Sequence, residues 1–130
     1  MARELVFTPE QVEAFCRETG DPNPIHTSFI ESSRLGYEST IVNGALSLSR
    51  AIGILHTEEE ILCGSMIIEI NSIFRNPMLS GYRYWLEIDL GGEFLSGAIA
   101  KYVCTYKQDD GRVTHKHDII CKRAIRGASA

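Results

Sequence analysis

The hydrophobic positions of the chain follow a helical period in its N-terminal part and a strand period in its C-terminal part. A first helix is expected from Pro9, because Thr8 and Gln11 have the spacing of a capping box and proline suits the first helical position. Gly20 tolerates the left-handed conformation that ends many helices, so the helix is expected to stop there. A second, short helix is expected over residues 27–35.

The longest helix is predicted over residues 43–56, where Asn43 is the expected N-cap. Its apolar residues lie on most sides of the helix: Ala45, Leu46, Leu48, Ala51, Ile52, Ile54 and Leu55. The exposed side is expected to be narrow and to consist of Ser47, Ser49 and Arg50. A helix that is apolar on most sides is usually buried, so the sequence predicts a helix enclosed by the rest of the fold.

Apolar and polar residues alternate in the second half of the chain, which predicts β-strands. Four long strands are expected, over residues 66–74, 82–90, 98–106 and about 112–125. Turns are expected at Asn76-Pro77, Gly91-Gly92 and Asp109-Asp110-Gly111. These strands favour an antiparallel meander wrapped around the buried helix. Residues 3–7 are expected to add a strand at the edge of the sheet, so the predicted fold class is α+β.

Composition and charge are those of an ordinary globular protein. The 130 residues fit a single domain over residues 1–130, and a hydrophobic fraction of 44% argues against disorder. The net charge of -4 and the absence of a Lys/Arg run argue against nucleic-acid binding. No membrane span and no secretory signal is visible, so a cytoplasmic location is expected. The four cysteines are expected to be free, mostly buried thiols: Cys16, Cys63, Cys104 and Cys121.

The segment from Asp21 to His26 combines two side chains suited to proton transfer. A carboxylate and an imidazole lie five residues apart, and Pro22 and Pro24 stiffen the loop between them and exclude a helix there. Such a rigid pair can hold one water molecule and move protons in either direction. The spacing alone favours a turn-forming aspartate and an incidental surface histidine, and only the wider motif changes this interpretation.

Three ordered stretches resemble the signature of the MaoC-like, or type 2, enoyl hydratases. Residues 20–26 read Gly-Asp-Pro-Asn-Pro-Ile-His and match the family pattern Gly-Asp-x-Asn-Pro-aliphatic-His. Residues 41–46 read Ile-Val-Asn-Gly-Ala-Leu and are similar to the family's Ile-Val-His-Gly-Met-Leu. Residues 74–81 read Phe-Arg-Asn-Pro-Met-Leu-Ser-Gly and are similar to its Phe-x-x-Pro-Val-x-x-Gly. The first match is specific, and the order and spacing of the other two strengthen it.

The resemblance implies a hotdog fold, in which an antiparallel sheet wraps a long central helix, and a homodimer with acyl-thioester sites near the subunit interface. It implies the reversible addition of water to a trans-2-enoyl thioester of coenzyme A or of an acyl carrier protein, giving the (R)-3-hydroxyacyl thioester. At the matching positions, Asp21 would take a proton from the attacking water, and His26 would hold that water and help to deliver a proton to the α-carbon. No metal and no cofactor are expected.

A helix N-terminus is expected to complete the site. Attack of water at the β-carbon pushes negative charge onto the thioester oxygen, and unpaired N–H groups at a helix N-terminus suit that charge. The matching family position makes Gly44 the expected donor, and the alternative is that glycine there only eases a tight turn or close packing. Asn23 is expected to support the loop through a side-chain hydrogen bond. Asn43 replaces the histidine of many relatives, which changes the local hydrogen bonding.

Two other features leave alternatives open. His115 and His117 share one face of the last predicted strand and could be two metal ligands, but no cysteine or acidic residue lies at a suitable distance, so no metal site is expected.

A thioesterase, in which a carboxylate activates water against the carbonyl, is the second function considered. The third is a subunit that binds acyl thioesters without turnover, paired with another hotdog chain.

Overall fold

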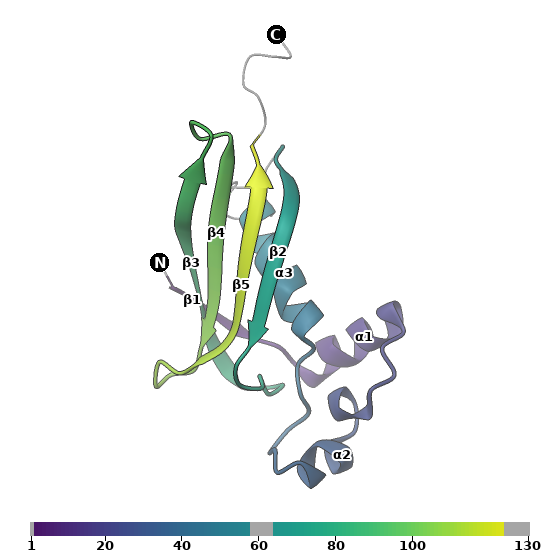
Figure 1. The fold of residues 1–130 in the computed structure, drawn as a ribbon. Helices are drawn as coiled ribbons and strands as arrows, with labels where there is room; N and C mark the ends of the chain where they lie inside the picture. The colour runs from purple at the N-terminus through teal and green to yellow at the C-terminus, as the bar shows by residue number, and fades with distance from the viewer. Residues whose placement is uncertain (1, 58–63, 124–130) are drawn as a thin grey trace.

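In the computed structural model, which describes residues 2–57 and 64–123, a five-stranded antiparallel sheet lies against a long helix (Figure 1). The strands are β1 (Ala2–Val6), β2 (Met66–Phe74), β3 (Arg83–Phe94), β4 (Ile99–Lys107) and β5 (Val113–Lys122). The helices are α1 (Pro9–Thr19), a 3₁₀ turn (Pro24–His26), α2 (Phe29–Arg34) and α3 (Gly44–Thr57). The predicted α+β class and the predicted edge strand are therefore confirmed.

The capping residues start and end α1 as the sequence predicts. The Thr8 hydroxyl accepts a hydrogen bond from the Gln11 N–H at 3.1 Å, and the Gln11 side chain accepts one from the Thr8 N–H at 2.9 Å. Gly20 ends the helix with a φ of 73°. The next segment differs from the prediction, because Pro24 begins a single 3₁₀ turn. Proline is tolerated there, since the first residue of a turn needs no N–H donor.

Helix α3 is the helix that the sheet encloses, as predicted, but its buried side was partly misassigned. Ala51, Ile54 and Leu55 are buried. Ser47, expected on the exposed side, is fully buried, whereas Ala45, expected in the apolar stripe, is exposed. The serine is buried because polar side chains of the sheet lie within hydrogen-bonding distance of it. A hydropathy pattern cannot show such partners.

The order of the strands is β1-β3-β4-β5-β2, so the predicted four-strand meander is wrong. The strands β3, β4 and β5 follow one another as expected, but β2 pairs with β5 and forms the opposite edge of the sheet from β1. Residues 75–82 therefore lead from β2, at one edge of the sheet, past β5 and β4 to β3. Alternation of apolar residues predicts a strand and its two faces, but it does not specify the neighbouring strand.

The turn expected at Gly91-Gly92 is also wrong, because both glycines lie inside β3. The register between β3 and β4 shifts between Leu90 and Gly92, which marks a β-bulge. A Cβ at Gly91 would lie 2.8 Å from Cγ2 of Val103, so the small residue permits the close approach of the two strands. The chain turns afterwards, at residues 95–98, while the predicted turn at residues 109–111 is present.

The core lies between α3, the inner face of the sheet and the start of the chain. Its buried hydrophobic residues are Phe7, Val12, Cys16, Val42, Ala51, Ile54, Leu55, Met78, Tyr84, Leu86, Ala100, Tyr102, Cys104, Tyr106, Ile119 and Cys121. The three described cysteines are free and buried, as expected, and Cys63 lies outside the described residues. The segment from α1 to α2 projects from one end of this body (Figure 1).

Candidate active site

The loop that follows α1 is fixed by short-range hydrogen bonds. The Asp21 N–H donates to the Cys16 carbonyl at 3.1 Å, and Asp21 Oδ1 accepts from the Asn23 N–H at 3.1 Å. Asn23 Oδ1 in turn accepts from the Ile25 N–H at 3.2 Å. Aspartate and asparagine favour such bonds to backbone N–H groups two residues ahead. Asn23 thereby links Asp21 to the start of the 3₁₀ turn that carries the histidine.

Asp21 and His26 face each other across this loop. Asp21 Oδ2 lies 3.6 Å from His26 Nε2, and the two side chains are 32% and 11% exposed. His26 Nδ1 lies 2.6 Å from the Ile41 carbonyl oxygen, which can only accept, so Nδ1 carries a proton. In the neutral imidazole, Nε2 therefore has a free lone pair directed toward the carboxylate. A water molecule beside the two atoms could donate a hydrogen bond to each of them.

Asn43 joins the pair from the start of α3. Its side-chain amide donates to Asp21 Oδ2 at 2.9 Å and to Cys16 Sγ at 3.4 Å. The N–H of Asn23 and the amide of Asn43 donate to the carboxylate, so they lower the pKa of Asp21 below its ordinary value.

The N-cap role expected of the Asn43 side chain is wrong. The residue precedes α3, and its backbone carbonyl accepts from the Leu46 and Ser47 N–H groups, each at 3.1 Å. Its side chain turns to Asp21 instead, and its Oδ1 has no hydrogen-bond partner among the described residues. The negative charge of Asp21 attracts the amide N–H₂ more strongly than the helix end attracts the amide oxygen.

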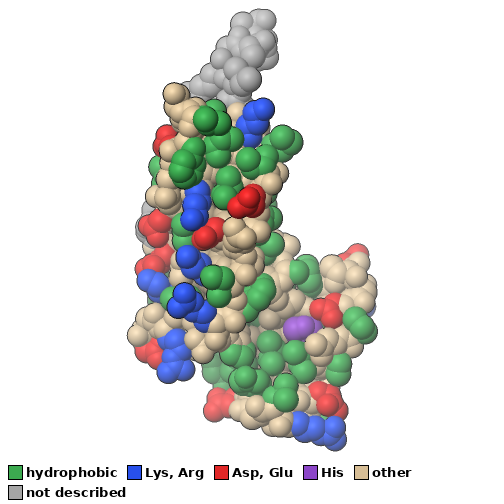
Figure 2. Space-filling view, in the orientation of Figure 1, with side chains coloured by type: hydrophobic (Ala, Val, Ile, Leu, Met, Phe, Trp, Pro, Cys, Tyr) green, Lys and Arg blue, Asp and Glu red, His purple; other side chains and the backbone are tan. Residues whose placement is uncertain are grey.

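Gly44 begins α3 beside an apolar cavity of about 330 Å³. As the first residue of a helix, it has a backbone N–H with no acceptor inside the helix. The cavity is lined by Ile25, His26, Ile41, Val42, Gly44, Phe74, Asn76, Pro77 and His115. A Cβ at Gly44 would lie 2.5 Å from the Phe74 ring, so close packing is a second reason for glycine here. Figure 2 shows histidine surface with hydrophobic side chains around it, where the projecting segment meets the sheet body.

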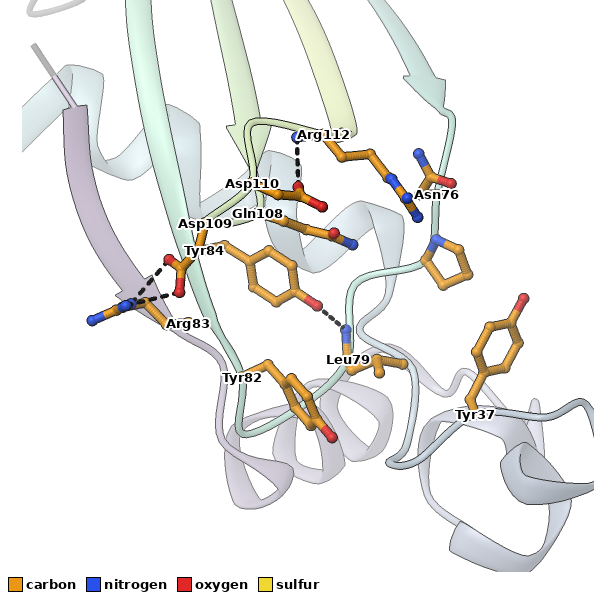
Figure 3. Close-up of a pocket in the computed structure, with 11 residues that line it drawn as sticks. Tyr37, Asn76, Leu79, Tyr82, Arg83, Tyr84, Gln108, Asp109, Asp110 and Arg112 are labelled. Carbon is orange, nitrogen blue, oxygen red and sulfur yellow. Dashed lines mark hydrogen bonds and ion pairs between the residues drawn. The ribbon is translucent and has the colours of Figure 1, made fainter.

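A larger cavity of about 600 Å³ adjoins the first (Figure 3). The two cavities share Asn76 and Pro77 in their walls. In the larger one, the Tyr84 hydroxyl accepts a hydrogen bond from the Leu79 N–H at 2.7 Å and so holds the loop that leads from β2 to β3. Arg112 points toward Asn76 at its rim in Figure 3.

His115 also borders this site, although no motif in the sequence predicts it there. It lines the cavity together with His26, and its ring is 3% exposed. One feature of the sequence could have indicated a buried polar cluster here. It is the pair of histidines on one strand face together with one serine, Ser47, on an otherwise apolar helix. Among residues 2–57 and 64–123, no group of three or more histidine, cysteine or acidic residues is arranged to hold a metal ion. No helix in that same part of the chain is long and apolar enough to span a membrane.

The comparisons with known proteins agree with this architecture. The family model described as a MaoC like domain matches residues 2–106. The (R)-hydratase from A. caviae involved in PHA biosynthesis has 21% identity and a TM-score of 0.83, with 95% of this chain and 92% of that chain covered. The R-hydratase PhaJ1 from Pseudomonas aeruginosa has 14% identity and a TM-score of 0.79, with 95% and 79% covered. A search of curated proteins found no match.

The HadBC complex from Mycobacterium tuberculosis, a 3R-hydroxyacyl-ACP dehydratase, is a third similar structure, with 20% identity and a TM-score of 0.78. The alignment covers 93% of each chain. The enclosed helix and the antiparallel sheet thus define a protein of the hotdog fold, as the sequence resemblance implies. The chain belongs to the MaoC-like domain family.

Proposed function

We propose that this protein adds water to trans-2-enoyl thioesters to give (R)-3-hydroxyacyl thioesters, and that it catalyses the reverse dehydration. The observation that carries the proposal is the pair formed by Asp21 and His26, whose Oδ2 and Nε2 atoms lie 3.6 Å apart beside an apolar cavity. The names of the similar structures, two (R)-hydratases and one 3R-hydroxyacyl-ACP dehydratase, support this reaction and its stereochemistry.

In the proposed reaction, a water molecule is hydrogen-bonded to both Asp21 Oδ2 and His26 Nε2. Its oxygen bonds to the β-carbon, and the electron pair of the double bond moves toward the thioester oxygen. The Asp21–His26 pair accepts one proton from the water and returns one proton to the α-carbon, so both residues end in their starting state. The low pKa of Asp21 keeps its carboxylate ionised at neutral pH.

The start of α3 is the proposed site of the thioester oxygen. The negative charge that develops on this oxygen would be stabilised by the N–H of Gly44 and by the helix dipole. The apolar residues around the same cavity would receive the acyl chain. The carrier, coenzyme A or the arm of an acyl carrier protein, would leave through the larger cavity past Asn76 and Pro77.

We also propose that the protein acts as a homodimer. The outer strand β2 exposes a set of large hydrophobic side chains, namely Met66, Ile68, Ile70, Ile73 and Phe74. A sheet edge with exposed apolar residues is prone to association, so a second copy that covers it would remove this surface from water. Sedimentation that shows only a monomer at working concentration would contradict this part. The free, buried thiols of Cys16, Cys104 and Cys121 fit the reducing cytoplasm, where we place the protein.

The test is the loss of the conjugated-enoyl absorbance when crotonyl-coenzyme A is mixed with the protein. Wild type should consume the substrate and give the (R)-3-hydroxy product. Asp21→Asn should lower the rate about 10²- to 10⁴-fold, because it removes a proton acceptor without changing the volume of the side chain. Asp89→Asn, the same change at an exposed position of β3, should keep the wild-type rate.

A parallel assay for free thiol separates hydration from thioester hydrolysis. Release of coenzyme A with the enoyl group intact would assign the site to a thioesterase instead. Binding of acyl thioesters without either reaction would identify a binding subunit. An Asp21→Asn variant that is folded and as fast as wild type would contradict the proposed role of the pair.

A further inference from the structure

A chain of four polar side chains, three of them buried, connects β2, β5 and α3 beside the proposed acyl cavity. Ser72 Oγ lies 2.7 Å from His117 Nδ1, and His117 Nε2 lies 2.8 Å from Ser47 Oγ. Ser47 Oγ also lies 2.7 Å from His115 Nδ1 and donates to the Gly44 carbonyl at 3.0 Å. Ser47 and His117 are fully buried. The reaction proposed above uses none of these four side chains.

The partners of Ser47 determine where the protons of both histidines lie. With the single hydroxyl proton of Ser47 on its bond to the Gly44 carbonyl, which can only accept, Oγ has two lone pairs left to accept hydrogen bonds. Both imidazoles must then donate to the two lone pairs of Ser47 Oγ, His117 through Nε2–H and His115 through Nδ1–H. In the neutral ring of His115, the other nitrogen, Nε2, is therefore left with a lone pair.

Burial keeps both rings neutral at physiological pH. It lowers the pKa of His115 and of His117 to about 4. For His115 the neighbouring imidazole acts in the same direction, while for His117 the nearby charge of Asp118 opposes the shift. The His115 ring thus presents a neutral hydrogen-bond acceptor rather than a positive charge, and a ligand carboxylate would find no donor on it.

No hydrogen bond within the described part of the chain occupies Nε2 of His115. Within the described part of the chain, the bond to Ser47 is the only hydrogen bond of the His115 ring, and the ring borders the cavity that also contains His26 and Gly44. Phe74 packs edge-on against His115, with ring centroids 4.8 Å apart, and helps to fix its orientation. Most of the other wall residues are apolar. An alkyl chain in the cavity would cover Nε2 without replacing the hydrogen bond that water makes to it.

We propose that His115 is a specificity-determining residue, and that the preferred acyl group carries a hydroxyl beyond its β-carbon which donates to His115 Nε2. The inference rests on the proposed function, because it takes the cavity at His26 and Gly44 as the acyl site. A site built to bond a substrate hydroxyl discriminates strongly against the analogue that lacks it, since the buried acceptor is then left unpaired. The chain through Ser47, His117 and Ser72 fixes the acceptor rather than touching the acyl group.

The test compares the binding of saturated thioesters, which need no turnover. Titration calorimetry would measure the affinity of hexanoyl thioesters and of hexanoyl thioesters hydroxylated at the γ, δ or ε carbon, each on coenzyme A and on acyl carrier protein. Wild type should bind one hydroxylated isomer at least about tenfold more tightly than the plain thioester. His115→Leu should abolish this preference and improve binding of the plain thioester.

Two variants provide the controls. His56→Leu removes the same type of side chain at an exposed position that lies outside both the cavity and this chain of hydrogen bonds, so the hydroxyl preference should persist. His115→Asn keeps a donor for Ser47 and removes the outward nitrogen, so it should lose the preference even if His115→Leu does not fold. Equal affinity for all thioesters in wild type, or a preference that survives both substitutions of His115, would overturn the inference.

The outcomes separate this inference from the proposed function. A hydroxyl preference in binding, without hydration of the matching enoyl thioesters, would support the role of His115 and contradict the proposed reaction. Hydration without any hydroxyl preference would support the proposed reaction and contradict the role of His115. Failure of every thioester on both carriers to bind would overturn both.

Discussion

Acid should destabilise this protein well above the pH at which carboxylates titrate, because two neutral histidines are buried in its core. Burial lowers the pKa of His115 and of His117 to about 4, whereas a histidine in the unfolded chain has a pKa of about 6.5. At pH values between these two pKa values, the histidines are protonated in the unfolded chain but not in the folded chain. The stability is therefore complete above about pH 6.5 and is lost progressively as the pH falls toward 4.

The size of the effect follows from the two pKa values. At pH 5, proton binding by the unfolded state costs about 2 kcal/mol of folding free energy per histidine, or about 4 kcal/mol for the two together. Ordinary domains have a total stability of roughly 5–15 kcal/mol. The two rings alone should then remove a large part of the stability between neutral pH and pH 5.

Urea unfolding at a series of pH values from 8 to 4.5 would measure this loss. The matched variant combines His115→Asn and His117→Gln, whose amides replace the ring nitrogens that donate to Ser47 but do not titrate. Its unfolding free energy should start below that of wild type at pH 7.5 and fall less steeply, by about 4 kcal/mol less at pH 5. His56→Gln, at an exposed position near the end of α3, controls for the removal of a histidine as such.

Parallel pH curves for wild type and the double variant would refute the reasoning. They would mean that the buried rings take up protons in the folded protein, or that the cluster opens to water before the protein unfolds. Direct titration of the two rings by NMR would then show pKa values close to that of an unfolded histidine.

Three further predictions concern the site. Asn43→Ala should raise the pKa of Asp21 toward its ordinary value, because it removes the donor at 2.9 Å from the carboxylate, and an NMR titration of the carboxyl carbon would show the rise. Gly44→Ala should displace the ring of Phe74, which is 56% exposed and can move, so the stability cost should stay below about 1 kcal/mol while crotonyl turnover falls. Adding Phe74→Ala should restore part of the activity, and additive effects of the two changes would contradict the contact. Tyr84→Phe should cost about 1–2 kcal/mol in thermal or urea unfolding, since it leaves a loop N–H without its acceptor, and an unchanged midpoint would disprove that role.

Local signals in the sequence determined the elements and one half of the site. The capping residues around Pro9, the left-handed Gly20 and the period-two strands all act through neighbours in the chain, so they can be recognised without the fold. The same is true of Asp21 and His26, because the prolines and Asn23 between them set the geometry of the loop over a few residues. The resemblance of that loop to a family motif extended the prediction to the fold.

Tertiary structure decided everything that depends on residues far apart in the sequence. It placed β2 beside β5 rather than β3, it turned the amide of Asn43 toward Asp21, and it brought Ser47 of α3 against His115 of β5. None of these contacts has a local cause, since a hydropathy pattern treats a serine on a helix as solvent-facing and a histidine on a strand as a surface residue. They arise because buried polar groups must find partners, and only the packing of the helix on the sheet determines which partners are within reach.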